Sequence, residues 1–169
     1  ERQITTRYGK TQVIICGETH LPPLVLFHGV GDDSAMMWLF NARQLSQHYR
    51  LFAVDTMGGP GKSVPNEAYN KQFDDLVWID ELLDGLKLDH VYMAGVSNGG
   101  YLVQYYGANR SERVSKLIAL ASSVPVETGH VMITMMKIFL PEALFPTDRN
   151  VSRLLRKLSG DHSQVFTEN

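Results

Sequence analysis

Between residues 91 and 102 the chain reads VYMAGVSNGGYL, with an apolar run at Val91–Val96 and a helical pattern that begins at Leu102. The segment fits the pattern G-x-S-x-G in the context of a strand followed by a helix. A serine on so sharp a turn, here Ser97, has strained backbone angles and presents its hydroxyl at the carboxyl edge of a sheet. A Cβ at Gly95 or Gly99 would obstruct the close approach of strand and helix. The alternative interpretation is a glycine-rich turn that only joins the two elements.

Strand and helix patterns alternate along the first three quarters of the chain. Short uninterrupted apolar runs are typical of strands covered on both faces, and they occur at Gln12–Cys16, Leu24–Phe27, Leu51–Val54, Val91–Val96 and Lys116–Ala121. Apolar residues three or four apart predict amphipathic helices at Trp38–Tyr49 and Phe73–Leu86. The stretch Ile4–Cys16 favours an antiparallel hairpin. This order predicts the α/β class, with a mostly parallel sheet and helices on both faces.

The pattern changes after about Pro125, where no further strand is predicted. A Met-rich region at Val131–Phe145 is followed by a basic helical pattern at Asp148–Leu158. We therefore divide the chain into a sheet-forming part, residues 1–124, and a helical part, residues 125–169.

Composition excludes several classes of function. The 169 residues are 44% hydrophobic and 20% charged, which is the balance of a globular domain. A net charge of −2 leaves no basic excess for nucleic acid. The single cysteine, Cys16, excludes a disulfide framework, and no apolar run is long enough to span a membrane. No signal peptide is visible, and we expect a cytoplasmic protein.

A second glycine-containing turn follows a predicted strand at His28-Gly29-Val30-Gly31. This turn can aim the Val30 N–H at the same oxyanion that the Asn98 N–H would reach, and two such donors form an oxyanion hole. The N-terminus of the helix behind Ser97 adds partial positive charge. We interpret the His28 side chain as structural, hydrogen-bonded to a nearby carbonyl, and not as a catalytic base.

Together these features resemble the α/β-hydrolase superfamily, specifically its single-domain esterase-like members. The order of motifs is similar: His28-Gly29 after the third strand, DTMGGPGKS at residues 55–63 after the fourth, Ser97 after the fifth, and ERVSKLI at residues 112–118 leading into the sixth. The resemblance implies that residues 1–124 are the N-terminal part of the core and that residues 125–169 begin a helical cap. It also implies Ser97 as the nucleophile, Val30 and Asn98 as oxyanion donors, and no cofactor or metal. Relatives that open epoxides or displace halide have Asp at this turn, so Ser97 argues against both activities.

The remaining members of a catalytic triad are not assigned in this chain. In the family the acid and the histidine follow later strands, and this sequence ends before such strands. His130 and the pair Asp161-His162 fall in the expected cap, and Glu127 follows the sixth strand too late to be the acid. We expect further chain or a second piece to supply the rest of the fold, the acid and the base.

The preferred hypothesis is a serine hydrolase that cleaves carboxylic esters of small to medium apolar substrates through an acyl-enzyme on Ser97. The same scaffold also occurs in C–C bond hydrolases, aminopeptidases and perhydrolases, which are alternatives to an esterase. A non-catalytic small-molecule-binding protein is the alternative to an enzyme. A phosphate-binding loop at residues 56–63 is disfavoured, because Thr56 replaces the required first glycine and Pro60 lacks an N–H. No pair of residues has metal-ligand spacing.

Overall fold

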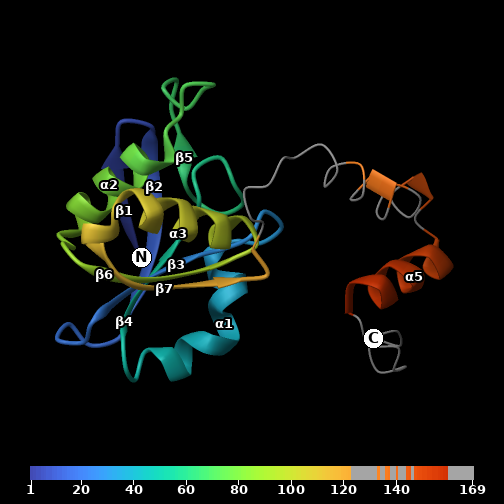
Figure 1. Cartoon of the computed structure of the whole chain (residues 1–169), viewed down its shortest axis with the longest axis horizontal. Helices are drawn as coiled ribbons and strands as arrows, with labels where there is room; N and C mark the ends of the chain where they lie inside the picture. Colours follow the sequence, from blue (N-terminus) through green and yellow to red (C-terminus); the bar gives the residue numbers. More distant parts are fainter. Residues whose placement is uncertain (123–132, 134–135, 138–139, 141–143, 146, 160–169) are drawn as a thin grey trace. The chain divides into compact units, whose positions relative to one another are not determined.

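The computed structural model of the 169-residue chain (Figure 1) describes residues 1–122, 133, 136–137, 140, 144–145 and 147–159. The chain divides into two compact units, Glu1–Val124 and Pro125–Asn169. These bounds coincide with the division made from the sequence, and the role of the second unit as a cap stays a prediction.

One twisted sheet forms the centre of the first unit. Its strands are β1 (Arg2–Thr6), β2 (Gly9–Cys16), β3 (Pro23–Phe27), β4 (Arg50–Val54), β5 (Val64–Pro65), β6 (Val91–Val96) and β7 (Val114–Leu120). Along the sheet the order is β1-β2-β4-β3-β6-β7, with the two-residue β5 paired to β2. The predicted hairpin β1–β2 is antiparallel, β2 joins β4 antiparallel, and β4, β3, β6 and β7 run parallel. The predicted α/β class is confirmed.

Three helices cover the two faces of this sheet. They are α1 (Ser34–Leu45), α2 (Asp75–Leu86) and α3 (Asn98–Asn109). In Figure 1, α2 and α3 lie on one side of the sheet and α1 on the other. The central strand β3 contributes side chains to the cores on both faces of the sheet. Val25 and Phe27 belong to the core beneath α2 and α3. Leu24 and Leu26 pack with Trp38 of α1. This strand is therefore buried on both faces, as its uninterrupted apolar run predicts.

Two helices are shorter than their apolar patterns. Helix α1 ends at Leu45, so Tyr49 lies beyond it, where its ring meets the Tyr92 ring edge to face. Helix α2 begins at Asp75 because the side chain of Asp74 caps its free N–H groups, which leaves Phe73 outside the helix. Both aromatic residues are packed, so the apolar spacing identified packing correctly but not the helix ends.

The expectation that the sixth predicted strand is covered on both faces is wrong. In β7 the side chains of Leu117, Ile118 and Leu120 are 39%, 58% and 46% exposed. The strand pairs only with β6 within the described residues, at the end of the sheet, and among the helices described there α3 packs against it. One edge of β7 and much of its side-chain surface are therefore uncovered in the first unit.

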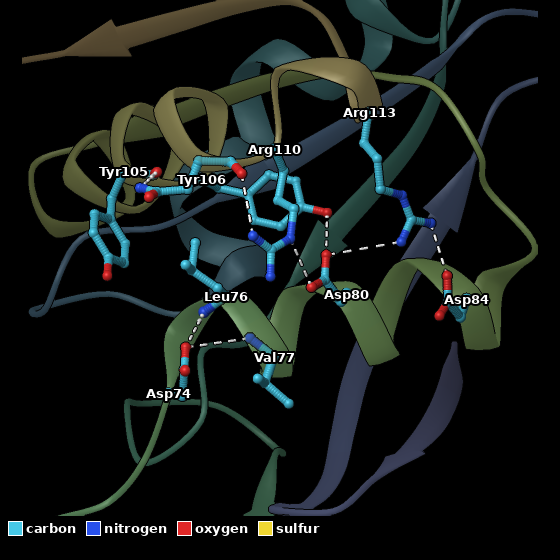
Figure 2. A network of polar contacts seen from close by, with 10 residues as sticks. Asp74, Leu76, Val77, Asp80, Asp84, Tyr105, Tyr106, Arg110 and Arg113 are labelled. Atoms are coloured by element: carbon cyan, nitrogen blue, oxygen red, sulfur yellow. Dashed lines mark hydrogen bonds and ion pairs between the residues drawn. The ribbon is translucent and has the colours of Figure 1, made fainter.

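A polar network fixes α3, the helix that follows Ser97, against α2 (Figure 2). The Tyr106 hydroxyl donates to Asp80 Oδ1 at 2.8 Å, and Arg110 Nε donates to Asp80 Oδ2 at 3.0 Å. Arg113, from the motif that precedes β7, donates to Asp84 Oδ1 and to a backbone carbonyl, each at 2.8 Å. Burial, with the hydrogen bond to Asp80 as the second cause, raises the pKa of Tyr106.

In the second unit, helix α5 (Asp148–Ser159) confirms the predicted basic helix, and Arg149 and Arg153 on it are exposed. Most of the Met-rich region lies outside the described residues. None of the helices described is both long enough and apolar enough to cross a membrane.

Candidate functional site

Ser97 occupies the single residue between β6 and α3. Its backbone has φ 54° and ψ −114°, in the positive-φ region that side-chain-bearing residues rarely adopt. The Ser97 N–H donates to the Leu120 carbonyl of β7 at 2.9 Å, and its carbonyl accepts from Tyr101 N at 3.0 Å. The strained conformation is thus held by backbone bonds on both sides, as the strand–serine–helix pattern predicts.

The two glycines that flank this serine allow the close approach that we expected. A Cβ on Gly95 would lie 2.1 Å from the carbonyl oxygen of Gly99 in the first turn of α3. A Cβ on Gly99 would lie 2.4 Å from the carbonyl oxygen of Phe27 at the end of β3. Both obstacles are backbone atoms, so neither position can accept a larger residue unless the strands and helix move apart.

The loop after β3 approaches the same turn. A Cβ placed on Gly29 would be 3.3 Å from the Ser97 Cβ, so this loop runs directly beside the serine. Val30 follows with its side chain 73% exposed. The N–H groups of Val30 and Asn98 have no hydrogen-bond acceptor among the described residues, and both residues line one pocket of about 410 Å³. Their convergence on a common oxyanion stays a prediction.

His28 has the structural role that we expected. It is completely buried, and its Nε2 accepts from the Thr56 N–H at 2.9 Å. Because Nε2 is the acceptor, the proton resides on Nδ1, which lies 2.6 Å from the Gly29 carbonyl oxygen. The imidazole therefore ties the loop after β3 to the loop after β4, and both of its nitrogens are engaged.

Asp55 organises the second of these loops, a role that sequence reasoning did not assign. It is buried, and its carboxylate accepts from the Ser34 N–H at 3.1 Å, the Ser34 hydroxyl at 2.5 Å and the Lys62 N–H at 2.7 Å. The sequence signal that could have identified this role of Asp55 is the family-like DTMGGPGKS motif.

The same loop does not have the structure of a phosphate-binding loop. The Lys62 side chain pairs with Glu1, Nζ to Oε1 at 2.9 Å, and β5 rather than a helix follows Ser63. The phosphate-loop interpretation is therefore excluded by the local structure.

The pocket beside Val30 and Asn98 extends between the loop after β4 and the start of α2. Its walls include Phe73, Trp78 and Asp75. Burial, followed by the charge of Asp74, raises the pKa of the Asp75 carboxyl. No sequence pattern singles out Asp75, since an acidic residue in a first helical turn is ordinarily a surface feature.

A base and its acid are not part of the geometry described. Within residues 1–122 the Ser97 hydroxyl has no hydrogen bond to a histidine or a carboxylate. Glu127, His130 and Asp161-His162 lie outside the described residues. No group of three or more potential metal ligands occurs in the part of the chain that is described.

Comparison with known proteins gives consistent matches. The family profile described as the alpha/beta hydrolase fold matches residues 22–167. Carboxylesterase YbfK of Bacillus subtilis (strain 168) is 34% identical over 118 residues, 70% of this chain and 40% of the relative. The uncharacterized carboxylesterase nap of the same organism is 36% identical over 125 residues, 74% of this chain and 40% of the relative.

Among solved structures, naproxen esterase from Bacillus subtilis has a TM-score of 0.74 at 27% identity, covering 98% of this chain and 57% of that one. The chain spans about 40% of the length of the curated relatives it matches. The mostly parallel sheet, the strained serine between β6 and α3, and a profile match over residues 22–167 together show that the chain belongs to the alpha/beta hydrolase fold family.

Proposed function

We propose that this chain is the nucleophile-bearing part of a serine hydrolase that cleaves carboxylic esters. Ser97 Oγ attacks the acyl carbon, and the N–H groups of Val30 and Asn98 stabilise the oxyanion of the tetrahedral intermediate. The alcohol leaves as the acyl-enzyme forms, and water then releases the acid. A histidine moves the proton in both steps, oriented by an acid.

The observation that carries this proposal is the strained conformation of Ser97. A non-glycine residue at φ 54° costs on the order of 1–3 kcal/mol and persists where the surrounding structure imposes it. A turn whose only role was to connect β6 to α3 would relieve this strain with glycine. The Asn98 N–H, the first of α3, has no acceptor in the described part of the chain and gives the same turn an anion-stabilising group next to the hydroxyl. The carboxylesterase relatives support the ester as substrate class.

We propose that the histidine, the acid and the remaining sheet come from protein outside these 169 residues. The relatives are about two and a half times as long as the segment they share with this chain. An apolar groove of about 500 Å³ lies along α1 and the last two strands, lined by Trp38, Tyr92, Leu117 and Ile118 among others. Further elements of the same protein would bury this surface and pair with the free edge of β7.

The substrates are proposed to be small to medium in size and largely apolar. The pocket next to the two N–H donors holds about 410 Å³, within the usual range for small-molecule sites. Met57, Phe73, Trp78 and Leu102 contribute apolar surface to it. No cofactor is needed for this chemistry.

The test is labelling with a fluorophosphonate, followed by intact mass measurement and mapping of the modified peptide. The fluorophosphonate is applied separately to the 169-residue chain and to the longest naturally occurring protein that contains this sequence. We expect one adduct on Ser97 of the longer protein and little or none on the 169-residue chain, because activation requires the base. The Ser97→Ala variant should lose the adduct. Ser115→Ala, which removes an exposed serine of β7, should retain it.

Three results would contradict parts of the proposal. An adduct at another residue would remove the nucleophile role of Ser97. Labelling of the 169-residue chain as fast as the longer protein would show that the base lies within it. No adduct on either protein would overturn the hydrolase and leave the non-catalytic binding protein.

A further inference from the structure

We propose that Asp75 is a specificity-determining residue that makes the pocket beside Ser97 select substrates carrying a positively charged group, such as a protonated amine. As an assignment of substrate class this rests on the proposed hydrolase function, and it narrows that function from apolar esters to those with a cation on an otherwise apolar body. The preference of the pocket for a positively charged ligand can be measured as a binding affinity, without any turnover of substrate.

The first observation is the position of the Asp75 carboxylate. Asp75 lines the same pocket as Val30 and Asn98, the two proposed oxyanion donors, so a substrate that fills this pocket would meet all three residues. The residue is half-buried. Its carboxylate forms no hydrogen bond and no ion pair with any described residue. A charged group that is partly desolvated and unpaired gains more from a ligand cation than a solvated surface carboxylate does.

The second observation is the absence of a competing charge. Lys, Arg and His do not occur among the described residues that line the pocket, where Asp75 is the charged residue. The titratable neighbour that affects it most is Asp74, also acidic, which raises the pKa of Asp75 after burial does. An anionic substrate would therefore meet repulsion here without compensation, whereas a cation would relieve it.

The third observation is the aromatic wall next to the carboxylate. The rings of Tyr69 and Phe73 meet edge to face, with centroids 4.7 Å apart, and Phe73 also contacts Trp78 at 6.0 Å. All three residues line the pocket. Aromatic faces attract alkylammonium groups through their quadrupole, and this attraction adds to that of a nearby carboxylate. The two features together favour a cation over a neutral hydrogen-bond donor.

Capping of α2 does not account for Asp75. The cap is Asp74, whose Oδ1 accepts from the N–H groups of Leu76 at 2.9 Å and Val77 at 3.3 Å; Figure 2 shows these two bonds. Asparagine at position 74 would still cap the helix, so Asp74→Asn removes one charge from the same turn while leaving the pocket wall intact.

The test compares three six-carbon ligands that differ in charge: hexylammonium, 1-hexanol and hexanoate. Binding to the 169-residue chain is followed at pH 8 from backbone amide shifts in ¹H–¹⁵N NMR spectra, which also locate the ligand. We expect hexylammonium to bind about tenfold more tightly than 1-hexanol, and hexanoate more weakly than both, with shifts at Val30 and Asn98. Tenfold corresponds to about 1.4 kcal/mol.

Variants decide whether Asp75 is responsible. Asp75→Asn should bring the ratio of the ammonium and alcohol Kd values to about one, and Asp75→Glu should restore most of the preference. Asp74→Asn should leave the ratio within about twofold of the unmodified chain. Unchanged dispersion of the amide spectrum shows in each case that the variant is folded.

Equal Kd values for the ammonium and the alcohol would overturn the proposal, as would a preference that survives Asp75→Asn or shifts confined to another surface. These outcomes are independent of the labelling of Ser97. Loss of labelling with the ammonium preference intact would refute the hydrolase but leave a cation-selective pocket. Labelling without the preference would leave the hydrolase and refute the role of Asp75.

Discussion

The strain at Ser97 can be measured by comparing two variants that both lack the hydroxyl. Ser97→Ala keeps the Cβ and therefore keeps the unfavourable φ of 54°. Ser97→Gly removes the Cβ and with it the steric cause of the strain. The difference in the free energy of unfolding between the two variants isolates the backbone from every contact that the hydroxyl makes.

The expected magnitude follows from two opposing effects. Relief of a strained φ/ψ combination contributes on the order of 1–3 kcal/mol in favour of glycine. Glycine loses more backbone entropy on folding than alanine does, which costs about 0.5–1 kcal/mol. We therefore expect Ser97→Gly to be more stable than Ser97→Ala by up to about 2.5 kcal/mol, although glycine is ordinarily the less stable residue.

The assay is urea denaturation with linear extrapolation, and the variants should share one m-value. Ser115 provides the matched control pair, because it is an exposed serine in β7 whose backbone is extended. There, Ser115→Gly should be less stable than Ser115→Ala by about 0.5–1 kcal/mol. If Ser97→Gly is also less stable than Ser97→Ala, the reasoning is refuted, because the turn at Ser97 then stores no strain.

Three further predictions concern the elements around the site. Gly95→Ala should destabilise the chain by about 3 kcal/mol in urea denaturation, because its Cβ would lie 2.1 Å from backbone, whereas Gly31→Ala, with nothing within 4 Å, should change stability by less than about 1 kcal/mol. Asp55→Ala should cost about 2–4 kcal/mol, because two buried donors of Ser34 and the part-buried Lys62 N–H lose their acceptor, and the exposed Asp89→Ala should be close to neutral. The pKa of Tyr106 is raised in the folded chain, so its contribution is complete below the unfolded pKa near 10 and is lost as pH rises through the folded value. Above pH 10 the free energy of unfolding should therefore fall by up to about 1.4 kcal/mol per pH unit; Tyr106→Phe should abolish this component and Tyr105→Phe should not.

Much of the fold was predictable because its signals are local. Four apolar residues in a row at Leu24–Phe27 alternate between two buried faces, which is the pattern typical of a central parallel strand. The turn around Ser97 was likewise predictable, since both glycines are required by backbone atoms within a few residues or on the adjacent strand. The function of His28 was also predicted correctly, although its partner Thr56 lies 28 residues away.

The remaining features depend on contacts that local sequence does not encode. The apolar run in β7 predicts burial, yet Ile118 is 58% exposed, because periodicity reports what a strand is suited to contact and not what the chain supplies. Asp75 is indistinguishable in sequence from a surface residue in a first helical turn. Its place in the pocket depends on the loop after β4, because residues 56–60 of that loop line the same pocket.

The residues that hold the strained turn at Ser97 determine which proposed catalytic groups this part of the chain positions. The carbonyl of Leu120 and the Tyr101 N–H in the first turn of α3 hold the Ser97 backbone, and both belong to residues 1–124. The proposed nucleophile and oxyanion donors are therefore positioned before any acid or base is added. Within residues 1–122 the Ser97 hydroxyl has no histidine partner, so the base that we propose for proton transfer is not part of the geometry described. A fluorophosphonate rate measured with and without the additional protein consequently reports what the histidine, the acid and the remaining sheet together add to the serine that residues 1–124 already position.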